Sequence, residues 1–323
     1  MSRDETFDIM KCIGILSVIA GHCVIPDMLH RFIYMWHMPL FFFVSGYFYR
    51  PQSEKEVAKN SLRGLIIPYF ATFVVILTVT IINDILYDKS LTLNRIQGLL
   101  TIRYYFDSTE MKYGGAGALW FLPALFWCRV IYNTCNKFIS NNLIKWGGVV
   151  TVSYLVTYVG FRYFVPLFLC HGLQGIIFYH IGCESRKVNY LKKQQATPFL
   201  FAVLVCGIAL GMSQGTVYCF ALYYSCWILN IIAASCCVLL IYHVSCKVTH
   251  WKYSTIMSWV GRYSILVLCI HATDGILGVT ASITKTDNTI GRLLYNISFF
   301  LIALSLTYLA SKSKRIRRIY NIK

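Results

Sequence analysis

Ten long apolar segments restrict what this chain can fold into. Hydrophobic residues make up 57% of the 323 residues and charged residues only 13%, which is more apolar than a soluble domain. A helix needs about 20 apolar residues to cross about 30 Å of hydrocarbon. We therefore predict an all-α polytopic membrane bundle with spans near residues 8–26, 33–49, 64–87, 118–138, 146–165, 167–183, 197–213, 218–244, 255–273 and 290–311.

The basic residues predict how the bundle is oriented, because Lys and Arg accumulate in short cytoplasmic loops. With the N-terminus inside, 22 of the 30 basic residues fall on the cytoplasmic side. Residues 312–323 form a basic cytoplasmic tail, so an even number of spans places the C-terminus inside as well. The weak point is 197–244, where GMSQGTVYCFALYYSCW could hold another span or a re-entrant segment.

Charge and cysteine content exclude some classes of partner. The net charge of +17 is dispersed among loops and contains no nucleic-acid motif, so we expect the lipid bilayer and not nucleic acid as the surroundings. The 13 cysteines lie mostly in apolar segments without a C-x-x-C pair, so we expect no metal site. No separate soluble domain is evident, and residues 1–323 form one membrane-embedded domain; the oligomeric state stays open.

The first span carries a polar stripe. In FDIMKCIGILSVIAGH, Asp8, Lys11 and His22 fall on one helical face, and about 21 Å separates the first from the last. One interpretation is an interfacial Asp8–Lys11 ion pair and a histidine that only bonds a neighbouring helix. The other is that His22 lines a functional cavity as a base, because ionisable groups inside membranes are costly and usually functional.

A second histidine, His37, opens the next span close to the same outer boundary. A short external loop joins the two spans, so we expect the imidazoles of His22 and His37 to converge. Ser45 and Gly46 interrupt the aromatic run that follows. Small residues of this kind allow close approach of a helix or of a ligand, and both interpretations stay open.

Five motifs in order resemble the membrane acyltransferase 3 family, whose members transfer acyl groups to sugars and other hydroxyl-bearing acceptors. The first two are FDIMKCIGILSVIAGH and HMPLFFFVSGYF, with an acidic residue, a basic residue and a terminal Gly-His in the first. The other three are RGLIIPY, GALWFLPALF and GRYSILVLCIH. Together they extend over nearly the whole chain.

The resemblance implies an integral membrane O-acyltransferase with about ten helices in a bacterial inner membrane. It implies a cytoplasmic acyl-CoA co-substrate, expected to be acetyl-CoA, and an acceptor hydroxyl on a cell-surface polysaccharide, such as an exopolysaccharide, or on its lipid-linked precursor. The residue matching the family's catalytic histidine is His22, with His37, Asp8 and Lys11 as further candidates. Direct attack by the acceptor and a transient acyl-histidine both stay open.

The cytoplasmic loop after the second span offers cations for the CoA phosphates. Arg50, Lys59 and Arg63 lie there, and Arg63 matches the family's arginine before the IIPY motif. Positive-inside bias alone also explains such a cluster. Many relatives have another arginine three residues earlier, where this chain has Asn60, with Lys59 as a substitute.

Two further residues are candidates for binding the acceptor or for structure. Trp120 follows the glycine-rich YGGAG at the mouth of the fourth span and could stack on a sugar or anchor the helix at the interface. His271 ends the ninth span near the outer face, as a third imidazole or as an interfacial residue. A carboxylate partner for His22 would come from Asp27 or Asp274.

Two other functional classes fit a helical bundle with a polar route. A transporter or flippase for a sugar-containing lipid or small solute would also line its path with intramembrane polar residues, although the sequence has no internal repeat. A structural partner of a polysaccharide synthase would not need His22 or Arg63. Solute flux without CoA consumption would identify the transporter.

Overall fold

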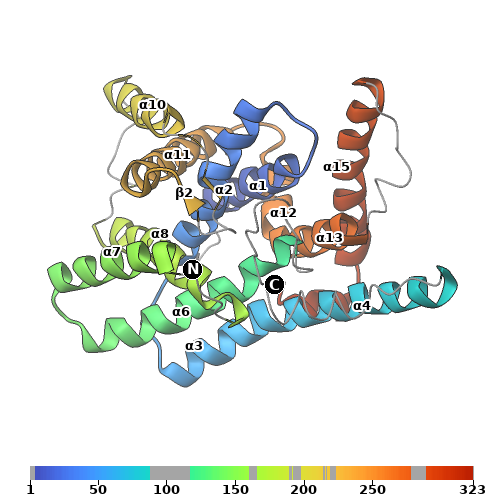
Figure 1. Cartoon of the computed structure of the whole chain (residues 1–323), viewed down its shortest axis with the longest axis horizontal. Helices are drawn as coiled ribbons and strands as arrows, with labels where there is room; N and C mark the ends of the chain where they lie inside the picture. Colours follow the sequence, from blue (N-terminus) through green and yellow to red (C-terminus); the bar gives the residue numbers. More distant parts are fainter. Residues whose placement is uncertain are drawn as a thin grey trace.

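The protein is helical throughout most of its described length. The computed structural model describes residues 4–87, 117–159, 166–188, 191, 198–213, 215, 217–218, 223–277 and 289–322. The elements, labelled in Figure 1 where there is room, are α1 (Glu5–Gly21), α2 (Asp27–Tyr47), α3 (Glu54–Ser61), the π-helix η1 (Leu62–Ile66), α4 (Ile67–Tyr87), η2 (Gly117–Trp120), α6 (Phe121–Phe138), α7 (Asn142–Val159), η3 (Pro166–Phe168), α8 (Leu169–Lys187), α10 (Pro198–Ser213), β1 (Val217–Tyr218), β2 (Tyr223–Tyr224), α11 (Trp227–Val248), α12 (Ser254–Arg262), α13 (Ser264–Leu277), α15 (Thr289–Ser311) and α16 (Lys314–Ile319).

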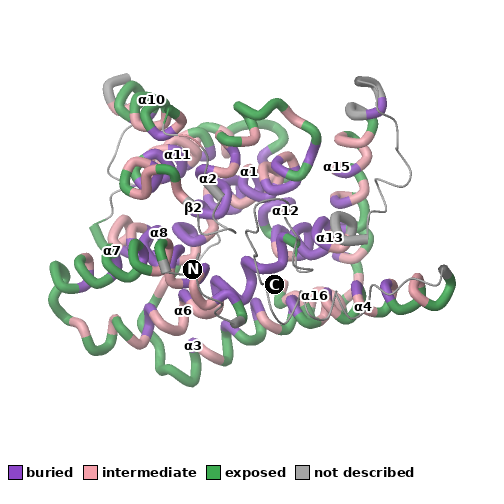
Figure 2. Tube along the Cα trace, in the orientation of Figure 1, coloured by how far each residue is buried: buried purple, intermediate pink, exposed green. Residues whose placement is uncertain are grey.

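Helices α1 and α2 form the centre of the molecule. They pack against each other, α8 and α11 lie along α2, and α11, α12 and α13 lie along α1. Figure 2 shows α1, α2, α8 and α13 largely buried, with exposed residues concentrated on the outer helices. The middle parts of α1 and α2 therefore lie within the protein interior, whereas residues at their ends, such as His22 and Met28, are exposed.

The outer helices present large apolar side chains to their surroundings. Exposed apolar residues include Ile85 of α4, Phe201 of α10 and Leu309 of α15, which are 77%, 56% and 62% exposed. A soluble protein seldom exposes such continuous apolar surface. Three helices (Glu54–Leu86, Trp227–Val248 and Leu294–Ser311) are long and apolar enough to cross a membrane, and α12 with α13 makes a fourth if the bent pair is one span. The length and apolar composition of these helices, together with the exposed apolar side chains, therefore indicate a membrane protein.

The described helices overlap all ten predicted ranges, but two of those predictions need correction. The range 255–273 is not one straight helix, because α12 and α13 meet at a bend of 67°. The range 218–244 does not begin as a helix: β1 and β2 form a two-residue antiparallel ladder with Val217 opposite Tyr224, and α11 starts only at Trp227. The hydropathy did not locate either break, although residues 197–244 were the weak point of the predicted spans.

One long helix along the lower edge of Figure 1 is assembled from α3, η1 and α4. It begins at a capping box in which the Ser53 hydroxyl accepts from the Glu56 N–H and the Glu56 carboxylate accepts from the Ser53 N–H. The π-helix at Leu62–Ile66 inserts an extra residue into this helix. Such insertions often occur at functional sites, and this one contains Arg63.

Candidate functional site

His22 occupies the end of α1, where the helix stops after Gly21. The backbone N–H of His22 still donates to the Ile19 carbonyl at 3.0 Å, so the ring position follows from the last helical turn. A Cβ at Gly21 would lie 2.9 Å from the Tyr34 ring, which is closer than ordinary contact. The glycine therefore lets α2 approach α1 at the level of His22.

The His22 ring lies beside α13. Its centroid is 5.1 Å from that of His271. The His271 side chain is buried at 2% exposure, whereas His22 keeps an exposed surface. The Nδ1 atom of His271 is buried without a hydrogen-bond partner among the described residues. Because a buried polar atom is normally paired, this pair of rings has the character of a binding site.

Tyr34 links His22 to His37 along α2. The Tyr34 ring centroid is 6.4 Å from that of His22 and 5.0 Å from that of His37, and His30 stacks on Tyr34 at 4.1 Å. The imidazoles of His22 and His37 thus both lie near the Tyr34 ring. We call His22, His30, Tyr34, His37 and His271 the histidine cluster.

The protonation of the His37 ring can be assigned from its geometry. Its Nδ1 lies 2.7 Å from the Ile33 carbonyl oxygen. A carbonyl oxygen only accepts, so Nδ1 carries the hydrogen and donates. In the neutral ring Nε2 is then a hydrogen-bond acceptor. His37 is therefore set to accept a proton or a hydrogen bond from a hydroxyl.

Helix α15 closes the cluster from the other side. The Asn296 amide accepts from the Val24 N–H at 3.0 Å and donates to the Val24 carbonyl at 3.0 Å. This two-way contact ties the segment after His22 to α15. One turn further on, Phe299 meets His271 edge to face, with centroids 4.8 Å apart. In the sequence, Asn296 is one of several polar residues of an apolar span, and nothing there distinguishes it from the others.

Asp8 and Lys11 lie at the opposite end of α1 from the histidine cluster. Their side chains form an ion pair at 2.6 Å, as the interfacial interpretation predicted. The Asp8 carboxylate is 4% exposed and the Lys11 side chain 25%. Fourteen residues of helix separate Asp8 from His22, or about 21 Å. The pair therefore cannot orient His22 by direct contact.

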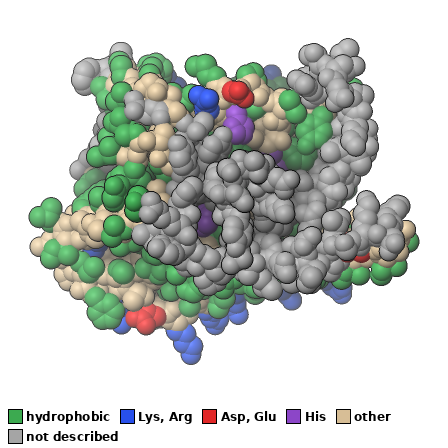
Figure 3. Space-filling model, viewed as in Figure 1, with side chains coloured by type: hydrophobic (Ala, Val, Ile, Leu, Met, Phe, Trp, Pro, Cys, Tyr) green, Lys and Arg blue, Asp and Glu red, His purple; other side chains and the backbone are tan. Residues whose placement is uncertain are grey.

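The candidate donor residues lie on the lower edge of the molecule. Arg50, Lys59 and Arg63 are all exposed, and Figure 3 shows basic side chains along this edge beneath α3 and α4. Part of the loop that carries these cations is helical, as α3. Asn60, which stands where many relatives have arginine, donates to the Gln52 side-chain carbonyl at 3.0 Å. This position therefore contributes a local hydrogen bond and no cation.

Gly46 belongs to a helix crossing. A Cβ there would lie 1.9 Å from the Tyr179 carbonyl oxygen of α8, and the same holds for Gly182 against the Phe43 carbonyl at 2.2 Å. The Cys183 thiol donates to the Gly46 carbonyl at 3.2 Å. Of the two interpretations, close helix packing fits Gly46. Ser45, its neighbour, is half-buried.

Trp120 packs against rings outside the histidine cluster. The Trp120 side chain is 6% exposed and lies against Phe168 and His171, with centroids 6.5 and 5.2 Å apart. Asp27 is exposed at the start of α2. The side chain of Asp274 and the glycines at residues 114–116 lie outside the described residues. Within the described part of the chain, no group of three His, Cys, Asp or Glu side chains is placed to hold a metal ion.

A second polar network, which sequence reasoning missed, joins α2, α6 and α8. The Tyr132 hydroxyl lies 2.8 Å from Nδ1 of His180, which is fully buried. Nearby, the Tyr49 hydroxyl donates to Asn133 at 3.1 Å, and Arg186 donates to the Tyr49 carbonyl at 3.0 Å. These bonds satisfy polar groups at helix ends. The network therefore fixes the helix positions, and its residues are too scattered in sequence to form a motif.

Comparison with known families agrees with this arrangement. The model of an acyltransferase domain, that of the acyltransferase 3 family, matches residues 4–312, nearly the whole chain. The chain therefore belongs to the acyltransferase 3 family. No curated protein and no solved structure matches it. Membership supports an acyltransferase in a membrane, and the match includes both the α1 histidine and the arginine in η1.

Proposed function

We propose that this acyltransferase 3 protein is an O-acyltransferase that takes an acyl group, acetyl in our proposal, from cytoplasmic acyl-CoA. The acceptor is a hydroxyl of a cell-surface polysaccharide or of its lipid-linked precursor. The observation that carries the proposal is the histidine cluster at the end of α1. There an exposed imidazole, His22, lies against a buried one, His271, inside a membrane protein of an acyltransferase family.

The proposed reaction needs a base and a group that stabilises developing charge. In the direct route, His22 removes the proton of the acceptor hydroxyl, and the oxygen attacks the thioester carbonyl carbon. The carbon–sulfur bond breaks, and the leaving CoA thiolate takes the proton back from the His22 imidazolium. In the two-step route, the His22 nitrogen first takes the acyl group and then passes it to the acceptor.

The other rings have supporting parts in this proposal. His271 lies close enough to His22 to hold it in one orientation or to donate to the carbonyl oxygen as charge develops. The Nε2 acceptor of His37 fits the hydroxyl of the acceptor. Asn296 holds the segment after His22 through both of its amide groups. Each of these three residues comes from a different helix, so the site depends on the fold.

The donor enters from the side of α3 and η1 in this proposal. CoA carries phosphates, and Arg63 suits them because a guanidinium donates two parallel hydrogen bonds. Lys59 and Arg50 add positive charge nearby on exposed positions. Because Asn60 bonds to Gln52, Arg63 supplies the directed phosphate contact that many relatives divide between two arginines.

The central test is His22→Ala in purified protein reconstituted into nanodiscs. We expect the release of CoA from acetyl-CoA, with acceptor-containing membrane extract present, to fall by at least about a hundredfold, the lower range for a lost general base. His250→Ala is the matched control, because His250 is an exposed histidine after α11. His250→Ala should keep the wild-type rate. If His22→Ala also keeps that rate, the catalytic assignment is wrong.

Two further measurements separate the alternatives. Acid quenching after mixing with labelled acetyl-CoA, without acceptor, gives protein-bound label only in the two-step route. NMR of surface glycans from cells with the wild-type protein and with His22→Ala identifies the acceptor: we expect an acetyl signal that only the wild type produces. Solute flux into vesicles without CoA consumption would instead indicate a transporter.

A further inference from the structure

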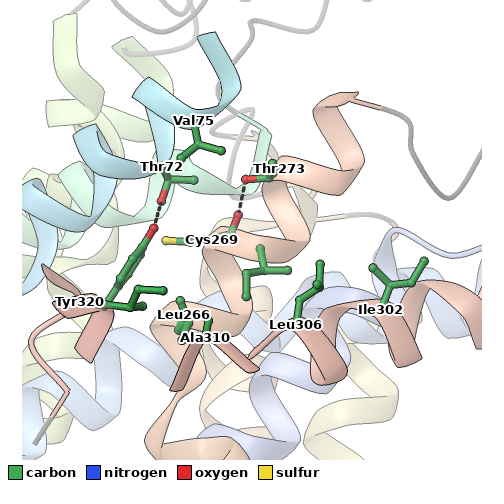
Figure 4. A pocket seen from close by; sticks show the side chains of 11 residues that line it. Thr72, Val75, Leu266, Cys269, Thr273, Ile302, Leu306, Ala310 and Tyr320 are labelled. Carbon is green, nitrogen blue, oxygen red and sulfur yellow. Dashed lines mark hydrogen bonds between the residues drawn. The ribbon is translucent and has the colours of Figure 1, made fainter. Parts of the chain in front are cut away.

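An apolar pocket separate from the histidine cluster opens between four helices. It has a volume of about 310 Å³ and lies between α4, α13, α15 and α16. Its walls are mainly aliphatic, as Figure 4 shows for the labelled side chains; they include Val75, Leu266, Ile270, Ile302, Leu306 and Ala310. The size is at the lower end for pockets that bind small molecules.

The few polar groups in the wall are already paired with each other. The Thr72 hydroxyl donates to the Pro68 carbonyl at 2.8 Å and lies 3.0 Å from the Tyr320 hydroxyl. The Thr273 hydroxyl donates to the Cys269 carbonyl at 2.8 Å. A cavity holds water only where polar groups are available to bind it. The pocket therefore suits a hydrocarbon chain and not a polar ligand.

Helix α16 places positive charge beside this pocket. Ile316 and Tyr320 line the pocket from α16, which is anchored by the Tyr320–Thr72 contact. Arg317 follows Ile316 in the sequence, and its Nε atom is buried without a hydrogen-bond partner among the described residues. An unpaired guanidinium N–H is costly and prefers a phosphate or carboxylate oxygen. The helix that contributes Ile316 and Tyr320 to the hydrocarbon wall thus also carries a guanidinium whose Nε is unpaired among the described residues.

The pocket is on a different flank of α13 from the histidine cluster. Leu266, Ile270 and Thr273 face the pocket at intervals of four and three residues. His271 follows Ile270 by one residue, about 100° around the helix, and its ring meets His22 instead. A ligand in the pocket would therefore contact the helix that carries His271 without entering the reaction site.

We propose that this pocket binds one acyl chain of an anionic phospholipid, whose headgroup phosphate accepts from Arg317. The pocket is bounded by α4 and α15, whose outer faces are exposed and apolar, so a membrane lipid can reach it laterally. The basic residues of α16 favour an anionic over a zwitterionic headgroup. A long-chain acyl-CoA shares the chain and the phosphates, and the experiment below separates the two.

The test is native mass spectrometry of the purified full-length protein, released from detergent after incubation with phosphatidylglycerol, phosphatidylcholine or palmitoyl-CoA. We expect one phosphatidylglycerol to remain bound in preference to phosphatidylcholine. Ala310→Phe puts a ring into the pocket and should abolish that binding. Its control is Leu301→Phe on the same helix: Leu301 is 59% exposed and half a turn around α15 from Ala310.

The headgroup contact has its own matched pair of variants. Arg317→Gln should weaken phosphatidylglycerol binding about fivefold, as expected for the loss of one basic residue at a membrane surface, and should remove the preference over phosphatidylcholine. Arg318→Gln, an exposed position on the far side of α16 from Ile316, should change neither. If Ala310→Phe protein does not elute as a single species, Ala310→Leu replaces it.

Three results would overturn the proposal. The first is wild-type binding of phosphatidylglycerol by a folded pocket-filling variant. The second is equal retention of phosphatidylcholine by the wild type. The third is that palmitoyl-CoA displaces phosphatidylglycerol and that Ala310→Phe abolishes the binding of palmitoyl-CoA, which would identify the pocket as a donor site. None of these depends on the His22 assay, so the two proposals fail independently.

Discussion

Gly46→Ala should force α2 away from α8 and lower the stability of the bundle. The added Cβ would lie 1.9, 2.7 and 2.9 Å from the carbonyl oxygen, carbonyl carbon and Cα of Tyr179, whereas carbon atoms in contact stay about 3.5–4.0 Å apart. All three obstacles are backbone atoms, so no side chain can rotate to make room. The two helices must separate by more than about 1 Å.

The expected cost combines two opposing effects. Overpacking a tight core costs roughly 1–3 kcal/mol, and a rigid backbone obstacle favours the upper end. Replacing glycine by alanine in a helix stabilises by about 1 kcal/mol. The net loss is therefore about 2 kcal/mol, which lowers the apparent Tm by about 3 °C in a chain of this size.

The assay is thermal unfolding in detergent, followed by size-exclusion chromatography of the heated samples. Gly148→Ala in α7 is the matched control, because a Cβ at Gly148 would meet nothing within 4 Å. That variant should gain about 0.5–1 kcal/mol. A Gly46→Ala protein as stable as Gly148→Ala would refute the close crossing of α2 and α8.

Three other substitutions test the arrangement around the site. Lys11→Met removes the ammonium group 2.6 Å from the Asp8 carboxylate and should lower the free energy of unfolding by about 1–3 kcal/mol. Adding Asp8→Asn to this variant should recover part of the lost Tm, and no recovery would argue against the ion pair. Arg63→Gln should raise KM for acetyl-CoA at least about tenfold with little change in kcat, and an unchanged KM would place the donor elsewhere. Asn296→Ala removes both hydrogen bonds to the Val24 backbone. Measured by CoA release, it should lower kcat and leave KM for acetyl-CoA unchanged. A change in KM alone would contradict a positioning role for Asn296.

Sequence reasoning located the histidines but not their arrangement. The apolar runs and the family motifs identified His22 and His37, because both interrupt segments that are otherwise fit for hydrocarbon. His271 was a third candidate on the same evidence, and its ring is the histidine ring nearest to His22 among the described contacts. The pairing of His22 with His271 depends on the bend between α12 and α13, which no local sequence pattern predicts.

The candidate donor residues show the same division. The basic residues of the loop after the second span were identified in the sequence, and only the structure shows that Lys59 lies on a helix, α3. The π-helix that contains Arg63 could not be read from the sequence, because one inserted residue changes the direction of a side chain without changing composition. Asn60 was recognised as a departure from the family, and only the structure shows its bond to Gln52.

The sequence by itself determined that this chain is a helical membrane protein of the acyltransferase 3 family. Hydropathy and motif order are properties of single segments, and each segment forms its helix through bonds within itself. The tertiary structure alone decided which groups meet: His22 with His271, Asn296 with the Val24 backbone, and Tyr320 with Thr72. Those contacts join residues up to 272 positions apart, and they depend on how closely the helices pack, which glycines such as Gly46 control.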